Sequence, residues 1–370
     1  MRVLITGSEG FIGKNLYFYL KSYTEYEILT FNRCDQINEL KNKVNNSDVI
    51  VHLAGESRPK KKSLFFKGNV DFTKKLCEYI SLADKTIPIL FSSSIKVNDN
   101  TLYGQSKLEA ETLLQDLNKK NKNPIYIYRL PNIFGKWSRP NYNSLVSTLC
   151  HNISKNLPIK IDDETKVIGL SHVDDLISCF MLVLKKRIHK KTLNWPKIKP
   201  VYRISLGDLA DKIYDFNLNR KHHYINNVGN GLNRALYSTF MSYLDKDNFA
   251  TKVPKNLDKR GIFVEMLKTS NNGQFSFFTL KPGLIRGGHY HNTKTEKFFI
   301  VNGKAKFLFK NIVTNESVKI LTNANSPKII DTIPGWAHSI ENIGSQTLIG
   351  FIWANEIFDK KNPDTIVMKS

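Results

Sequence analysis

The feature that most constrains the fold is a glycine-rich turn near the start of the chain, between a predicted strand and a predicted helix. Residues 3–5 predict a short buried strand, residues 14–21 a helix, and residues 26–31 a second strand. Three glycines occupy the turn at a regular spacing: Gly7, Gly10 and Gly13. Glycines allow a tight turn and let a pyrophosphate approach the backbone at the helix N-terminus. The pattern predicts an α/β Rossmann domain that binds a dinucleotide.

The tip of the second predicted strand indicates which dinucleotide binds. An NAD site usually carries Asp or Glu here, which accepts hydrogen bonds from the ribose hydroxyls. This chain has Asn32 and Arg33 instead, and a guanidinium suits the 2′-phosphate of NADP. We therefore predict a preference for NADPH that depends on Arg33. The alternative interpretation is a plain surface arginine.

A pair of residues further along predicts proton-transfer chemistry. Tyr103 and Lys107 stand four residues apart where a predicted helix begins, so both side chains lie on one helical face. A lysine ammonium beside a phenol favours the phenolate, and we expect it to lower the tyrosine pKa. Such a tyrosine can exchange a proton with a substrate oxygen. Ser94 follows an apolar run and can donate a second hydrogen bond to that oxygen. Alone, the pair also fits a solvated helix face.

The remaining cofactor contacts are expected after the next predicted strand, residues 47–52. That strand leads into small residues that let a cofactor lie close to the backbone. Asn69 begins a further helix and either braces the strand ends or only caps the helix. We interpret His52 as structural. The residues expected to contact the cofactor are Gly7, Gly10, Phe11, Ile12, Gly13, Arg33, Leu53, Ala54, Gly55, Asn69, Tyr103 and Lys107.

Charge and composition exclude several classes of protein. The net charge of +22 invites a nucleic-acid interpretation, but the lysines are spread along the 370 residues and form no aromatic-interleaved basic motif. We therefore expect no nucleic-acid binding and a positive surface that attracts nucleotides. No apolar run approaches the roughly 20 residues that cross a membrane, and no signal peptide is visible. The four cysteines show no Cys-x-x-Cys pairing. We expect reduced thiols in a cytoplasmic protein.

The C-terminal third changes to the period-two pattern of strands, which predicts an all-β second domain. It contains His289-x-His291, and residues two apart on a strand face the same side. Glu296 and His338 add a carboxylate and a third imidazole. Three His and one Glu suit Zn, Mn, Fe or Ni. A coincidental histidine cluster is the alternative.

The first 220 residues resemble the extended short-chain dehydrogenase/reductase family, which includes nucleotide-sugar epimerases, dehydratases and reductases. The motifs that carry the resemblance occur in the expected order: Thr6-Gly7-x-x-Gly10-x-x-Gly13, His52-Leu-Ala-Gly55, Ser94, Tyr103-Gly-x-Ser-Lys107, Arg129-x-x-Asn132-x-Phe-Gly135 and His172-Val-Asp174-Asp175. The resemblance implies that Ser94, Tyr103 and Lys107 form a catalytic triad. It also implies that the segment from Asn132 onward contributes to a sugar-nucleotide pocket. Ser94 and Tyr103 are only nine residues apart, which suggests a shortened substrate loop.

The metal-ligand motifs resemble the two cupin motifs, which implies a small jelly-roll barrel with zinc at His289, His291, Glu296 and His338. The second motif has Ile333 where cupins usually place a proline. Asp258-x-Arg260-Gly261 also resembles the start of the sugar-nucleotide 3,5-epimerase cupins.

A reductase followed by a cupin resembles, over essentially the full length, the CapF-type bifunctional enzymes of capsular polysaccharide synthesis in the UDP-N-acetyl-L-fucosamine pathway. The resemblance implies a homodimer that acts on a UDP-linked 4-keto amino sugar. The cupin domain would epimerise C3, and the N-terminal domain would then reduce the C4 ketone with NADPH. We expect the NADP-binding reductase domain over residues 1–243 and the metal-binding epimerase domain over residues 244–370. Tyr290, Lys294 and Lys297 are all candidates for the base that removes the C3 proton, and the sequence does not choose among them.

Two other functions compete with this one. The first is a UDP-sugar 4-epimerase or 4,6-dehydratase whose cupin domain is only structural. Dehydratases of the family tend to carry Asp-Glu after the catalytic Ser or Thr, whereas this chain has Ile95-Lys96. The second is a non-catalytic binding protein, and such relatives typically lose the Tyr or Lys that this chain retains at positions 103 and 107.

Overall fold

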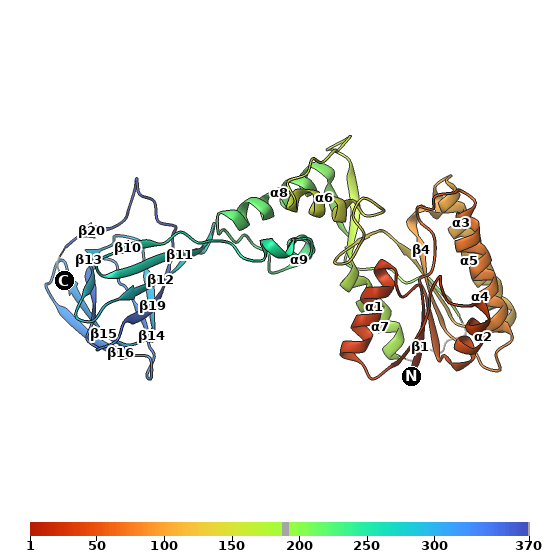
Figure 1. Cartoon of the computed structure of the whole chain (residues 1–370), viewed down its shortest axis with the longest axis horizontal. Coiled ribbons are helices and arrows are strands. Elements are labelled where there is room, and N and C mark those ends of the chain that lie inside the picture. Colours follow the sequence, from red (N-terminus) through yellow and green to blue (C-terminus); the bar gives the residue numbers. More distant parts are fainter. Residues whose placement is uncertain (187–191, 369–370) are drawn as a thin grey trace. The chain divides into compact units, whose positions relative to one another are not determined.

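The computed structural model describes residues 1–186 and 192–368, which divide into two compact units (Figure 1). Unit 1 comprises Met1–Tyr214 and Gly229–Asp245, and unit 2 comprises Asp215–Val228 and Lys246–Ser370. The chain therefore passes between the units three times. The predicted boundary between residues 243 and 244 stays a prediction.

Unit 1 is built on a twisted parallel sheet with the strand order β2-β1-β3-β4-β5-β8. The bounds of these strands are β1 Arg2–Thr6, β2 Glu27–Phe31, β3 Val49–His52, β4 Ile89–Ser94, β5 Ile125–Leu130 and β8 Leu193–Asn194. Every residue of β3 and β4 is buried, because helices cover both faces of the sheet. The predicted Rossmann fold is confirmed.

Two layers of helices cover this sheet, and each packs an apolar stripe against it. Figure 1 shows α1 and α7 on one face and α2, α4 and α5 on the other. Their bounds are α1 Phe11–Tyr23, α2 Ile37–Asn46, α4 Phe72–Ser81, α5 Leu102–Asn121 and α7 Val173–Lys186. Leu16 and Leu20 of α1 are fully buried on the first face, as are Ala110 and Leu114 of α5 on the second. These contacts hold α1 and α5 against the sheet and so position the N-terminal end of each helix relative to the strands.

The rest of unit 1 lies beyond the carboxyl ends of the central strands. A smaller sheet has the order β6-β7-β9, formed by Asn132–Phe134, Val167–His172 and Tyr202–Ser205. Helix α6 (Leu145–Ser154) packs against α9 (Gly231–Met241). The short elements are α3 Leu64–Phe66, a π-helical turn η1 Lys67–Asp71 and a 3-10 turn η2 Ile95–Asn98. Helix α8 (Leu206–Lys221) carries the chain from unit 1 into unit 2.

Unit 2 is a barrel of two antiparallel sheets with the orders β10-β11-β12-β19-β14-β17 and β16-β15-β18-β13-β20. Its strands are β10 Asn256–Asp258, β11 Gly261–Thr269, β12 Gly273–Leu280, β13 Ile285–Tyr290, β14 Glu296–Asn302, β15 Lys304–Asn311, β16 Ser317–Asn323, β17 Ile329–Asp331, β18 Trp336–Asn342, β19 Leu348–Ala354 and β20 Ile366–Val367, after a 3-10 turn η3 Lys246–Asn248. Phe278 and Phe298 of one sheet pack with Phe307 and Ile340 of the other. The predicted all-β cupin domain is confirmed.

The segment of unit 2 that precedes the barrel in sequence is tied to its edge. Tyr224 forms a parallel bridge with Lys268 of β11. The Ile225 backbone N–H donates to the Lys268 carbonyl oxygen at 2.8 Å, and the Lys268 N–H donates to the His223 carbonyl oxygen at 2.8 Å. In the described part of the chain, no helix is long and apolar enough to span a bilayer.

Candidate active sites

The glycine turn is packed so tightly that side chains at its positions would collide with backbone. Gly7 has a φ of +75°, and a Cβ there would lie 2.8 Å from the Ala54 Cα. A Cβ on Gly13 would lie 2.1 Å from the carbonyl oxygen of Gly7. Helix α1 begins directly after Gly10, so its first N–H groups point to the same place as the turn. Backbone donors at a helix N-terminus form a suitable site for a pyrophosphate.

The tip of β2 lies against the glycine turn and carries Arg33, one of the exposed arginines that line the cleft. Asn32 Oδ1 accepts hydrogen bonds from Ser8 Oγ at 3.0 Å and from the Glu9 N–H at 3.1 Å, so it braces the turn. The Arg33 side chain is 80% exposed and pairs with Glu56, which follows β3. Both line the cleft. Sequence reasoning missed Glu56, because nothing local links it to Arg33.

The residues after β3 lie against the turn, and a buried asparagine holds them there. Leu53 and Gly55 line the cleft, whereas Ala54 packs beneath Gly7. Asn69 Oδ1 accepts from the Glu56 N–H at 2.8 Å, and Asn69 Nδ2 donates to the Glu56 carbonyl oxygen at 3.0 Å. Asn69 Nδ2 also donates to Ser106 Oγ at 2.9 Å, which links this segment to α5. Asn69 thus lies behind the cleft wall.

His52 is fully buried between two threonines. Its ring nitrogens contact Thr6 Oγ1 at 2.7 Å and Thr73 Oγ1 at 2.9 Å. Burial, helped by the charge of Lys107, lowers the pKa of His52 to about 3. The ring is neutral at physiological pH and acts as a hydrogen-bonded part of the core.

The predicted proton-transfer residues meet where β4 ends and α5 begins. Ser94 is the last residue of β4 and Tyr103 lies in the first turn of α5, where interaction with the Ser94 hydroxyl acts to lower the pKa of Tyr103. Lys107 Nζ donates to the Ser92 carbonyl oxygen at 2.8 Å and lies 4.8 Å from the centre of the Phe91 ring. Ser94, Tyr103 and Lys107 line one cleft of about 890 Å³ together with the glycine turn.

The prediction that Lys107 lowers the pKa of Tyr103 is wrong. Burial raises the pKa of Tyr103, and the hydrogen bond with Ser94 offsets only part of that rise. Burial also lowers the pKa of Lys107 to about 8, while the Glu111 carboxylate raises it. The helical spacing brought the two groups together, but the loss of water around each one dominates its titration. At neutral pH Tyr103 is a phenol and Lys107 is mostly an ammonium.

A buried carboxylate behind Lys107 also went unnoticed in the sequence. Glu111 is fully buried one helical turn after Lys107. It accepts hydrogen bonds from Ser93 Oγ at 2.5 Å, from Arg129 Nε at 3.0 Å and from Arg129 Nη2 at 2.7 Å. The signal that could have revealed it is the i, i+4 Lys-Glu spacing on α5.

The wall of the cleft carries more positive than negative charge. Its cations are Lys14, Arg33, Arg58, Lys96, Lys107, Arg139 and Lys166, whereas its anions are Glu9 and Glu56. Asn132 also lines this wall, and its Nδ2 donates to the Gly169 carbonyl oxygen at 3.0 Å. The field of such a cleft attracts polyanionic ligands, which dinucleotides and nucleotide sugars are.

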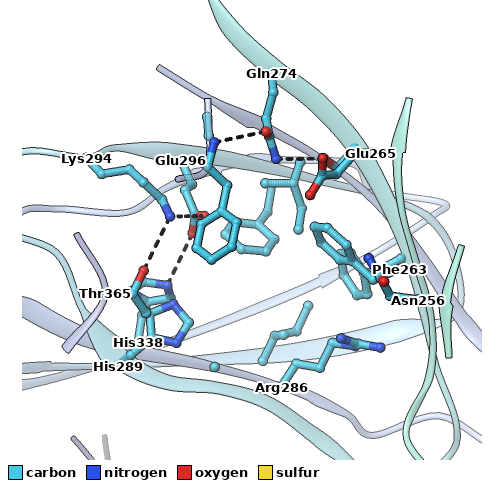
Figure 2. A pocket seen from close by; sticks show the side chains of 18 of the residues that line it. Asn256, Phe263, Glu265, Gln274, Arg286, His289, Lys294, Glu296, His338 and Thr365 are labelled. Atoms are coloured by element: carbon cyan, nitrogen blue, oxygen red, sulfur yellow. Dashed lines mark hydrogen bonds and ion pairs between the residues drawn. The ribbon is translucent and has the colours of Figure 1, made fainter. Parts of the chain in front are cut away.

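In unit 2 the four predicted metal ligands converge inside the barrel. His289 lies on β13 beside His338 of β18, His291 follows the end of β13, and Glu296 begins β14. The ligand atoms of all four lie within 4.8 Å of one another. Glu296 Oε2 is 3.4 Å from the Nε2 atoms of both His291 and His338. Figure 2 shows His289, His338 and Glu296 pointing toward a common centre.

The donor atoms of this cluster fit a divalent metal. His291 Nδ1 donates to the Asp364 carbonyl oxygen, which leaves the lone pair on Nε2. His291 Nε2 and both ring nitrogens of His338 are buried and have no hydrogen-bond partner. Burial, reinforced by the charge of His338, lowers the pKa of His289 to about 4. Neutral imidazoles with a carboxylate form a set that zinc accepts.

The metal-ligand cluster opens onto a pocket of about 670 Å³ inside the barrel. Lys294 is 7% exposed and lines this pocket, with its Nζ 3.7 Å from Glu296 Oε1 (Figure 2). Lys297 is exposed and pairs with Asp331, and Tyr290 does not line the pocket. Of the three candidates for the C3 base, Lys294 is the one placed at the pocket.

Comparisons with known proteins cover both units. Residues 3–194 match the NAD dependent epimerase/dehydratase family, and residues 256–366 match the polysaccharide biosynthesis C-terminal domain. A protein of Pseudomonas aeruginosa, UDP-2-acetamido-2,6-beta-L-arabino-hexul-4-ose reductase, is 46% identical over 99% of this chain and 98% of its own length.

Solved structures add a likeness over the whole chain. The capsular polysaccharide assembling protein CapF of Staphylococcus aureus superposes with a TM-score of 0.93 and 35% identity over 100% of both chains. UDP-glucuronic acid 4-epimerase of Bacillus cereus in complex with NAD gives a TM-score of 0.51 at 20% identity, over 58% of this chain and 83% of that one. At 20% identity the second likeness shows a shared fold and nothing of function.

Proposed function

This chain belongs to the CapF-type bifunctional enzymes, within the NAD dependent epimerase/dehydratase family, and from that premise we propose that it converts a UDP-linked 4-keto-6-deoxy-N-acetylhexosamine in two steps. The cupin domain, residues 244–370, epimerises C3. The reductase domain, residues 1–243, then reduces the C4 ketone with NADPH. The product is UDP-2-acetamido-2,6-dideoxy-L-talose for capsular or O-antigen polysaccharide. The name of the Pseudomonas aeruginosa relative, a reductase of a UDP-linked hexul-4-ose, supports this substrate.

The observation that carries the proposal is the single cleft that contains both the glycine turn and the trio Ser94, Tyr103 and Lys107. When bound in this cleft, a nicotinamide cofactor would supply the hydride that reduces the C4 ketone. Tyr103 Oη donates a proton to the C4 oxygen, and Ser94 Oγ donates a hydrogen bond to the same atom. Because burial raises the pKa of Tyr103, the phenol is protonated and ready to donate. Lys107 lines the same cleft, where its Nζ is held by the Ser92 carbonyl oxygen.

The first step, epimerisation at C3, requires the residues of the barrel. His289, His291, Glu296 and His338 would hold a divalent metal, with zinc as the first choice. When bound there, the metal supplies a Lewis acid that polarises a substrate oxygen. The C4 ketone makes the proton on the neighbouring C3 acidic. Lys294 Nζ lies at the pocket wall and is our candidate to hold that proton.

We extend the proposal to the setting of the enzyme. The setting that the resemblance to the CapF-type enzymes implies is a cytoplasmic homodimer, and we assign nucleotide ligands to the positive cleft. Arg33, which lies on the cleft, supports NADPH over NADH, because its guanidinium can bind the 2′-phosphate.

The test is to incubate the purified protein with the UDP-linked 4-keto sugar in D₂O, with and without NADPH, and to follow mass and NMR. We expect deuterium at C3 without NADPH, and a reduced sugar with stoichiometric NADPH oxidation when it is present. Inversion at C4 of a 4-hydroxy UDP-sugar without NADPH consumption would favour the 4-epimerase alternative. Loss of water from a 4-hydroxy UDP-sugar would favour the 4,6-dehydratase alternative.

A further inference from the structure

The chain close to its C-terminal end returns to the metal-ligand cluster and becomes part of its wall. Strand β20 pairs antiparallel with β13, placing Val367 opposite His289 and Ile366 opposite Tyr290. The Met368 N–H donates to the Gly288 carbonyl oxygen at 2.9 Å. Thr365 lines the barrel pocket and is labelled beside His338 and Lys294 in Figure 2. The ligand-bearing end of β13 is thus built against this returning segment.

One residue of this segment, Asp364, holds the turn between two ligands. Its carboxylate accepts hydrogen bonds from the backbone N–H groups of Asn292 at 2.9 Å, Thr293 at 2.7 Å and Lys294 at 2.8 Å. It also accepts one from Thr293 Oγ1 at 3.1 Å. These residues connect His291 to Glu296. The Asp364 carboxylate therefore holds the backbone of the turn that separates His291 from Glu296.

The backbone of the same residue orients the imidazole itself. The carbonyl oxygen of Asp364 accepts the Nδ1–H of His291, which fixes the tautomer with its lone pair on Nε2. That Nε2 is buried, has no hydrogen-bond partner, and lies 3.4 Å from Glu296 Oε2. A rotated ring, or the other tautomer, would remove this atom from the cluster.

We propose that Asp364 is a positioning residue for the divalent metal, acting through His291 and through the turn that joins His291 to Glu296. The proposal rests on the metal site proposed above. Asp364 lies more than 60 residues beyond Glu296 in sequence and is not itself one of the clustered ligands. Outer partners of this kind change metal affinity by roughly 10- to 100-fold when they are replaced.

The test uses the full-length protein stripped of metal by a chelator and dialysed. The variants are Asp364→Ala, which removes the carboxylate, and Asp364→Asn, which keeps its size and part of its acceptor capacity. The control is Asp359→Ala, because the Asp359 carboxylate lies in the same segment and bonds to its own neighbours Lys361 and Asn362. Zinc affinity is measured by competition with a chromophoric chelator, and the visible spectrum of the Co²⁺-loaded protein reports the ligand geometry.

We expect zinc to bind roughly 10- to 100-fold more weakly to Asp364→Ala, and less weakly to Asp364→Asn, with altered Co²⁺ bands in both. Asp359→Ala should match the wild type in both measurements. If Asp364→Ala does not fold, the zinc affinity and Co²⁺ spectrum of Asp364→Asn test the proposal instead. Wild-type zinc affinity and an unchanged Co²⁺ spectrum in the Asp364 variants, even with a lower melting temperature, would overturn the proposal and leave Asp364 a structural brace. A wild type that binds neither metal would instead overturn the metal site, and this inference with it.

Discussion

Replacing Glu111 by Gln should weaken the fold and shift the pH profile of ketone reduction. Glu111 is fully buried and accepts three hydrogen bonds, from Ser93 Oγ and from two nitrogens of Arg129. Glutamine keeps the volume and one acceptor oxygen but removes the negative charge. The substitution therefore tests the charge of Glu111 and leaves its packing almost unchanged.

The expected loss of stability follows from these hydrogen bonds. A hydrogen bond to a charged group contributes about 1.5–3 kcal/mol. Glutamine offers one acceptor oxygen where the carboxylate offers two, and its amide nitrogen cannot accept, so one of the hydrogen bonds from Arg129 is lost. The Arg129 side chain is 37% exposed, so water replaces part of what it loses. We expect the free energy of unfolding to fall by about 2 kcal/mol, measured by urea denaturation.

The effect on pH dependence has a definite sign. Burial lowers the pKa of Lys107 to about 8, and Glu111 is the group that raises it. Without that charge the pKa of Lys107 falls further, so the ammonium is lost at lower pH. If the ammonium supports reduction, NADPH oxidation by the variant should begin to decline at a lower pH than in the wild type.

The matched control is Glu109→Gln on the exposed face of the same helix. It should leave both the unfolding curve and the pH profile as they are in the wild type. A Glu111→Gln protein with wild-type stability and an unshifted profile would refute the electrostatic argument.

Three further substitutions test the proposed sites. Arg33→Ala should weaken the preference for NADPH over NADH by roughly ten- to hundred-fold, because a charge-assisted phosphate contact is lost; equal use of both nucleotides by the wild type would contradict this role. Tyr103→Phe should slow NADPH oxidation by about 10²–10⁴ while deuterium exchange at C3 continues; loss of both activities in a folded protein would show that the steps are not independent. His291→Ala should reduce bound metal in elemental analysis, lower the melting temperature and stop C3 exchange; exchange that survives chelation of the wild type would leave the barrel without the proposed chemistry.

Local patterns in the sequence were enough for the fold and for the motifs that build each site. The glycine turn is formed by residues that are close together in the sequence, so the spacing of its glycines is enough to predict a strand, a turn and a helix. The His-x-His motif likewise needs only the geometry of one strand end. Glu296 and His338 could be added because their motifs resemble those of cupins, and the structure brings all four side chains together.

What the sequence could not supply depends on residues that meet only after folding. Arg33 follows β2 and Glu56 follows β3, and these two strands are separated only by β1 in the folded sheet, so the two side chains can pair. Asp364 lies 73 residues from His291 along the chain, and no repeat or spacing connects them. The predicted direction of the Tyr103 pKa shift was also wrong. The side chain is buried by segments that are distant in sequence, whereas the sequence showed only its helical spacing to Lys107.

The repeated passage of the chain between the two units has a consequence for how such an enzyme can be divided. Residues 215–228 belong with the barrel although they precede the last helix of the reductase unit. A fragment starting at residue 244 would lack the strand-like partner that Tyr224 and Ile225 give to Lys268, and would expose that edge of β11. A single break in the gene therefore cannot yield both units whole. We therefore expect the two proposed sites to be inherited together on one uninterrupted chain.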